Sequence, residues 1–149
     1  MFTGIVTDVG EVVAVRARAE NLTRLKIACA YERATIADSA SIACSGVCLT
    51  VVGSGEEDGR TWFAADAAAE TLAVTTAGHW RHGTKLNLER ALKYGDEMGG
   101  HIVAGHVDGL SEILRREDLT DSARFTLRAP ASLSRFIAPK GSVALDGVL

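Results

Sequence analysis

The stretch GIVTDVGEVV, residues 4–13, recurs 101 residues later as GHVDGLSEIL, residues 105–114. The glycine, one valine and the glutamate coincide at this offset, and the other valines fall on leucine or isoleucine. The same offset matches SIACSGV at 41–47 with SVALDGV at 142–148. Two separated blocks that share one offset indicate a duplicated domain, because a period of about 100 residues is too long for a solenoid array.

Short runs rich in Val, Ile, Leu and Thr make up most of the chain, and many alternate apolar with polar residues. Such alternation is the period of a half-buried strand. RLKI at 24–27 and RFTL at 124–127 are one pair of such runs, one residue out of step with the repeat. Ser-Gly and Asp-Gly turns separate several runs. The pattern predicts an all-β barrel or sandwich, with short helices over 67–75 and 131–138.

The strand pattern is interrupted by YGDEMGG at 94–100. We therefore predict two domains, an N-terminal repeat of residues 1–97 and a C-terminal repeat of residues 98–149. The C-terminal repeat stops in the block equivalent to 48–50. Half a barrel would expose strand edges and apolar surface, so we expect further residues to complete it.

The composition favours a cytoplasmic protein. A net charge of -3 and a pI near 5.8 give no reason to expect nucleic acid or a membrane surface as a partner. No apolar run reaches the ~18 residues of a membrane span, and the N-terminus lacks the pattern of a secretory signal. Three cysteines form no disulfide framework, which fits a reducing compartment.

His101 and His106 stand in a segment of small residues. They lie five positions apart, so on one strand they point to opposite faces, which disfavours a shared metal ion. His106 takes the position that Ile5 holds in the N-terminal repeat. Each histidine is either a hydrogen-bonded structural residue or a group that handles protons. Lys140, just before a turn glycine, is either a solvated lysine or an anchor for an anionic or carbonyl-rich ligand.

The segment CSGVCLT at 44–50 predicts a β-hairpin. After its turn, Val47 and Leu49 face one side, which is core, while Cys48 and Thr50 face the other. The second side is either a small polar surface or the wall of a ligand site, and the sequence leaves both open. A reactive thiol requires a lowered pKa, which sequence does not reveal.

Five motifs together resemble the riboflavin synthase family, and the resemblance covers essentially the whole chain. They are MFTGIV (1–6), SIACSGVCLTVV (41–52), ETLAVTT (70–76), LNLERALKYGDEMGGHIVAGHVDG (86–109) and APKGSVALDGV (138–148). The resemblance implies two tandem six-stranded Greek-key β-barrels, the second incomplete here, in a homotrimer with active sites between subunits. It implies that two molecules of 6,7-dimethyl-8-ribityllumazine give riboflavin and 5-amino-6-(D-ribitylamino)uracil, with no metal and no cofactor.

Matched by position, the resemblance also implies site residues in both repeats. Those implied to bind substrate in the N-terminal repeat are Phe2, Gly4, Ile5, Val6, Ser41, Cys48, Leu49, Thr50, Asp66, Ala67, Ala68, Ala69, Glu70 and Thr71. Those in the C-terminal repeat are Gly105, His106, Val107 and Lys140. The implied catalytic candidates are His106, Cys48, His101, Lys140 and Asp146. Residues 4–6 and 48–50 would share one pocket, while 105–107 and Lys140 would contact the second lumazine.

The implied reaction suits these residue types. A lumazine is a flat ring that carries a polyol, and backbone amides, hydroxyls and small residues suit its edge. The reaction removes a proton from an acidic methyl group, for which a near-neutral imidazole is suited, so we favour His106 and then His101. The main alternative is a non-catalytic lumazine- or flavin-binding protein of the same fold. A less favoured alternative is a flavin-reductase-type barrel. Separately, lumazine synthase is a candidate partner.

Overall fold

The computed structural model describes residues 1–149, apart from the side chain of Glu20, and consists mainly of β-strands. The strands are β1 (Asp8–Ala17), β2 (Thr23–Cys29), β3 (Ser41–Cys44), β4 (Val47–Glu57), β5 (Arg60–Ala67), β6 (Lys85–Arg90), β7 (Glu112–Asp118) and β8 (Ala123–Arg128). The α-helices are α1 (Ala69–Val74) and α2 (Ala131–Ser134), and the 3₁₀ turns are η1 (Ala19–Asn21), η2 (Arg33–Thr35) and η3 (Thr76–His79). The predicted all-β class is therefore confirmed. None of these helices is long and apolar enough to cross a membrane.

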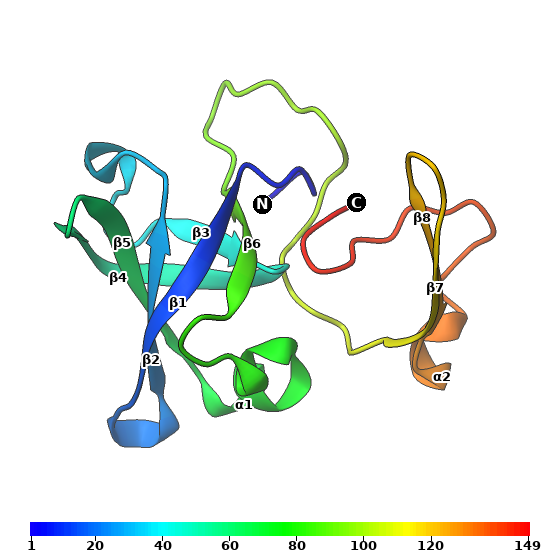
Figure 1. Ribbon diagram of the computed structural model, residues 1–149, viewed down its shortest axis with the longest axis horizontal. Helices are drawn as coiled ribbons and strands as arrows, with labels where there is room; N and C mark the ends of the chain where they lie inside the picture. Colours follow the sequence, from blue (N-terminus) through cyan, green and yellow to red (C-terminus); the bar gives the residue numbers. More distant parts are fainter.

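Strands β1 to β6 close into a barrel in the order β1-β2-β5-β4-β3-β6, with every neighbouring pair antiparallel (Figure 1). Three consecutive strands, β3, β4 and β5, lie side by side. The chain then returns through α1 and η3 to place β6 beside β3, which is a Greek-key connection. The six-stranded Greek-key barrel expected for the N-terminal repeat is confirmed.

The alternation along each strand sorts its side chains between core and surface. On β4, Val47, Leu49 and Val51 are at most 4% exposed, and they pack with Phe63 and Leu88 inside the barrel. These inward residues are aliphatic or aromatic, so side chains fill the interior of the barrel.

The two predicted helical segments differ in length in the structure. The segment 67–75 contains α1, which confirms the helix expected there. The segment 131–138 is helical only at its start, in α2. The position after η3 carries Trp80, which is 8% exposed and joins the barrel core.

The C-terminal repeat forms an antiparallel hairpin, β7 with β8, that stands apart from the barrel (Figure 1). It copies the β1–β2 pair, since the bulge between Val12 and Ala14 recurs 101 residues later between Ile113 and Arg115. Residues 18–22 join β1 to β2, whereas 119–122 join β7 to β8. The shorter turn explains why the following strands match one residue out of step.

The two repeats also share unusual backbone conformations at the same offset. Positive φ angles occur at four equivalent pairs: Gly4 and Gly105 (77° and 77°), Ser39 and Lys140 (64° and 60°), Ser45 and Asp146 (46° and 53°), and Gly46 and Gly147 (81° and 83°). The isolated bridge between Leu145 and Val148 is the equivalent of the pair Cys44–Val47 at the start of the β3–β4 hairpin. The duplication seen in the sequence is therefore a duplication of backbone geometry.

Candidate active site

The two repeats meet through equivalent segments arranged about an approximate twofold axis. Phe2 and Val103, which are 101 residues apart, exchange two backbone hydrogen bonds, from Phe2 N to Val103 O (2.8 Å) and from Val103 N to Phe2 O (2.9 Å). Gly46 meets its own equivalent, since a methyl group on Gly147 would lie 2.9 Å from the backbone nitrogen of Gly46. Only glycine fits this approach. When a residue contacts its own equivalent in the other repeat, the contact lies on the axis that relates the two repeats.

The segment around Gly4 and its equivalent around Gly105, called here the glycine segments, each contact the other repeat. The segment around Gly105 meets the β3–β4 hairpin, and the segment around Gly4 meets the equivalent turn of residues 142–149. Cys48 N donates to Gly105 O (2.9 Å), and the equivalent atom, Leu149 N, donates to Gly4 O (3.1 Å). Residues 105–107 therefore lie beside the β3–β4 hairpin, whereas Gly4 lies beside Leu149. This exchange differs from the grouping expected from sequence, in which 4–6 and 48–50 share one pocket. A repeat alone does not reveal which glycine segment meets which hairpin.

The outer face of the β3–β4 hairpin carries the polar side chains expected there. Cys48 is half-buried and Thr50 is exposed, and Ser41 lies opposite Thr50 across the hairpin. Leu49 is 4% exposed in the barrel core, so only its backbone can face a ligand. Burial raises the pKa of the neighbouring Cys44 thiol, so Cys48 is the hairpin cysteine that combines surface access with the predicted site.

The segment that follows β5 extends this face. Asp66 points outward beside Arg24 of β2, while Ala67 is buried. Ala68, Ala69 and Glu70 are exposed at the start of α1, and Thr71 is partly buried. The predicted residues of β3, β4, β5 and α1 therefore lie on neighbouring strands and on the connection after β5.

The histidines lie on the segment that crosses to the barrel. His106 is exposed between buried Gly105 and partly buried Val107, and Val107 packs against the barrel core. His101 is also exposed, and its Nε2 lies 3.3 Å from the hydroxyl of Ser142, the equivalent of Ser41. Neither imidazole is enclosed in the core. The structure places His106 near the β3–β4 hairpin and His101 near the equivalent turn of residues 142–149.

Asp146 is held against the barrel by residues of the N-terminal repeat. Asn87 Nδ2 donates to its carbonyl (3.0 Å) and to its carboxylate (3.1 Å). Partial burial raises the pKa of Asp146, and a hydrogen bond from Ser45 opposes that rise. Lys140 is exposed in a turn with a positive φ. Asp146 therefore lies at the contact between repeats, while Lys140 faces solvent.

Sequence reasoning missed one buried carboxylate, Glu89, which is 5% exposed. It accepts hydrogen bonds from Thr3 N (2.5 Å), Thr3 Oγ1 (2.7 Å) and Gly4 N (3.0 Å). These bonds hold the glycine segment whose carbonyls receive His101 N and Leu149 N. The alternation of β6 places Glu89 outward, and no sequence signal shows that residues 3–4 cover it. Phe2 beside them is fully buried.

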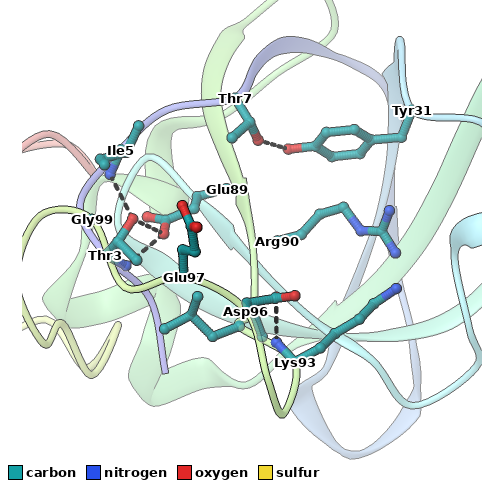
Figure 2. Close-up of a pocket in the computed structure, with 12 residues that line it drawn as sticks. Thr3, Ile5, Thr7, Tyr31, Glu89, Arg90, Lys93, Asp96, Glu97 and Gly99 are labelled. Carbon is teal, nitrogen blue, oxygen red and sulfur yellow. Dashed lines mark hydrogen bonds between the residues drawn. The ribbon is translucent and has the colours of Figure 1, made fainter.

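A groove lined by Thr3, Ile5 and Glu89 runs along the segment of residues 3–5 (Figure 2). Its volume is about 580 Å³, and it opens between residues 92–99 and the start of the chain. Of the predicted site residues only Ile5 lines it. The hydroxyl groups of Thr7 and Tyr31 form a hydrogen bond of 2.7 Å there, and the Arg90 guanidinium lies over the Tyr31 ring. The groove is therefore distinct from the hairpin face.

Comparison with known proteins defines the class first. The family model described as "Lumazine binding domain" matches residues 3–91 and 104–149. The fold resembles the crystal structure of LumP complexed with riboflavin, with a TM-score of 0.84 at 20% identity over 99% of this chain and 78% of that chain. LumP complexed with 6,7-dimethyl-8-(1'-D-ribityl) lumazine gives a TM-score of 0.77 at the same identity, over 99% of this chain and 77% of that one. A duplicated lumazine-binding domain is the class that fold and site define.

Sequence relatives narrow the class to an enzyme family. The riboflavin synthase of Brucella abortus (strain 2308) is 57% identical over 148 residues, which are 99% of this chain and 73% of that protein. The riboflavin synthase of Mycobacterium bovis is 43% identical over 99% of this chain and 72% of its own length. The chain belongs to the riboflavin synthase family.

Proposed function

We propose that the protein is the enzyme that converts two molecules of 6,7-dimethyl-8-ribityllumazine into riboflavin and 5-amino-6-(D-ribitylamino)uracil. The observation that carries this proposal is the 57% identity to a riboflavin synthase over 99% of the chain. The exchanged glycine segments support it, because the reaction needs two copies of one substrate. Each of the two similar sites binds one lumazine, and the proposed trimer brings two such molecules together between subunits, which supplies much of the rate.

The first proposed site is the outer face of the barrel. Cys48, Thr50 and Asp66 form its wall, and His106 approaches from the C-terminal repeat beside Gly105. The hydroxyl and carboxylate suit the ribityl chain, and the backbone of the glycine segment suits the edge of the ring. The division into residues 1–97 and 98–149 belongs to this proposal, since each site takes residues from both parts.

The second proposed site is the twofold equivalent of the first. Gly4, Ile5 and Val6 approach it from the N-terminal repeat, and Leu149 lies where Cys48 stands in the first site. Lys140 and Asp146 belong to this site. The differences between equivalent positions, Ile5 against His106 above all, let one lumazine act as donor and the other as acceptor.

His106 is the proposed base that removes the methyl proton, with His101 as the second candidate. An imidazole titrates near neutral pH, and both rings lie where solvent and a ligand reach them. Cys48 and Asp146 are the further catalytic candidates. The dismutation moves a carbon unit between two identical molecules, so its atoms and electrons balance without another reactant, and we propose no cofactor.

The proposed assembly is a homotrimer in the cytoplasm, with lumazine synthase as a candidate partner. The support for a trimer is membership of the family. The substrate is a small molecule, which agrees with the lumazine and flavin complexes of the structural relatives.

The test is to incubate the purified protein with the lumazine and no added cofactor, and to measure riboflavin by its absorbance and fluorescence. We expect riboflavin and the uracil product in equal amounts. A lumazine that binds but stays unconverted supports a carrier instead. Riboflavin that forms only when a nicotinamide cofactor is added contradicts the proposed mechanism.

A further inference from the structure

A row of outward side chains crosses four neighbouring strands of the barrel. Ser41 of β3 pairs with Thr50 of β4, and Asp66 of β5 pairs with Arg24 of β2. Val51 pairs with Ala65. Thr50 comes one residue before Val51 and Asp66 one residue after Ala65, so the antiparallel register places Thr50 and Asp66 opposite each other. The row is therefore Ser41, Thr50, Asp66 and Arg24, at strand spacings of about 4.8 Å.

The inward neighbours of this row confirm its direction. Leu25, Val51 and Ala65 are each at most 1% exposed in the core, and successive residues of a strand face opposite sides. The side chains of Arg24 and Asp66 are 34% and 19% exposed. The first three members of the row are proposed ligand contacts, whereas Arg24 is not among the site residues that the sequence implied.

Arg24 binds the Asp66 carboxylate through two parallel hydrogen bonds. Its Nε donates to Oδ1 over 2.7 Å, and its Nη2 donates to Oδ2 over 2.6 Å. This fork fixes the plane of the carboxylate as well as its charge. Each carboxylate oxygen has a second lone pair, so Asp66 keeps acceptor sites on the side away from Arg24.

We propose that Arg24 is a positioning residue of the barrel's ligand site, which acts by orienting Asp66 as an acceptor for the hydroxyl groups of a ribityl chain. This inference rests on the proposed function, since it names how one wall of that site is held. A polyol offers several O–H donors, and an ionised carboxylate held in one orientation is the strongest acceptor along the row. Ser41 and Thr50 supply weaker, rotatable hydroxyls beside it.

Charge at the site agrees with this role. The hydrogen bond from Arg24 is the main cause that lowers the pKa of Asp66, while burial opposes it. Arg18, beyond the end of β1, adds a weaker attraction, and β4 presents Thr50, which does not titrate in this range. Without Arg24, burial remains and the pKa of Asp66 rises. The site would then lose its ionised acceptor at a higher pH.

Lys26 provides a matched control on the same strand. It is the next outward residue of β2, where it pairs with Glu57 and lies 4.4 Å from the centroid of the Trp62 ring. It opposes Ala64 rather than Asp66 and takes no part in the row. Lys26→Ala therefore removes a cation and an ion pair from this face without touching the proposed site.

The experiment is a titration of the protein with 6,7-dimethyl-8-ribityllumazine, followed by ligand fluorescence between pH 3 and 7.5 (about the range that brackets the ordinary pKa of an aspartate). We expect Arg24→Ala to weaken binding by about threefold to tenfold at pH 7. As the pH is lowered, the affinity of the Arg24→Ala variant for the lumazine is expected to fall at a higher pH than the affinity of the natural protein does. Arg24→Lys restores part of the loss, and Lys26→Ala changes nothing. Thermal unfolding verifies that each variant is folded.

A double-mutant cycle tests whether Arg24 acts through Asp66. In the Asp66→Asn background, Arg24→Ala is expected to weaken binding by less than about twofold. An equal loss in both backgrounds overturns the inference, as does an unchanged affinity and pH profile in Arg24→Ala. A natural protein that does not bind the lumazine overturns the proposed function as well, so the two failures are distinguishable.

Discussion

The hairpins β1–β2 and β7–β8 have the same local structure but different surroundings. Both are antiparallel, and both carry a bulge at the same point of the repeat. In the first hairpin, Val12 and Ile27 are fully buried, because β5 and β6 continue the sheet on either side and close the barrel. Their equivalents, Ile113 and Leu127, are 61% and 37% exposed. Pairing and turns therefore follow from local sequence, whereas burial depends on strands far along the chain.

The largest difference between the hairpins is expected in stability. Ile27→Ala lowers the free energy of unfolding by about 3 kcal/mol, because it leaves a cavity in a closed core, whereas Leu127→Ala lowers it by less than about 1 kcal/mol. Denaturant unfolding of the 149-residue chain measures both. Equal losses would mean that the C-terminal hairpin is packed as tightly as the barrel.

The next comparison is between His106 and its equivalent, Ile5. His106→Ala is expected to lower turnover by about a hundredfold through loss of the proposed base, with a change in lumazine affinity of less than about threefold. His82→Ala, in the turn before β6, serves as the control with unchanged turnover. Steady-state rates and binding titrations separate the two effects. Normal turnover in His106→Ala would move the role to another residue, with His101 tested next.

The two glycine segments also differ in their anchors. Glu89 binds Thr3 and Gly4, whereas the C-terminal repeat has Ala104 in place of Thr3. Glu89→Ala leaves two buried N–H groups and a hydroxyl without their acceptor, which costs about 2 kcal/mol of stability. Hydrogen exchange at the amides of Thr3 and Gly4 measures the loosening directly. Exchange as slow as in the natural protein would show that other contacts hold this segment.

The smallest effect concerns Tyr31, which packs against the barrel core and has no aromatic equivalent in the C-terminal repeat. Burial raises its pKa to about 12, and its hydrogen bond with Thr7 opposes part of the rise. Its contribution to stability is present below the ordinary phenol pKa of about 10 and is lost as pH rises toward the folded value. In Tyr94→Phe, tyrosinate absorbance reports Tyr31 alone. A midpoint near pH 10 would contradict its burial.

The sequence predicted much of the proposed site, because the outward alternation of Cys48 and Thr50 is a local property of one strand. It did not predict Arg24 beside Asp66. That pair forms because β2 and β5, which are separated along the chain by β3 and β4, become neighbours in the barrel. The opposition of Thr50 and Asp66 further depends on the bulge between Val51 and Gly53. Alternation shows which face a residue takes, but not which strand lies beside it.

Sequence alone determined the all-β class, the duplication and the turns, because strand period and turn chemistry are read within a few residues. Tertiary structure decided how the duplicated parts combine. It buried Phe2 and Glu89 and exchanged the glycine segments between the hairpins. These features depend on the docking of one repeat against the other about a twofold axis. Two copies of one pattern specify the same local structure twice, and only packing decides which residues of each copy are buried and which segments of the two copies meet.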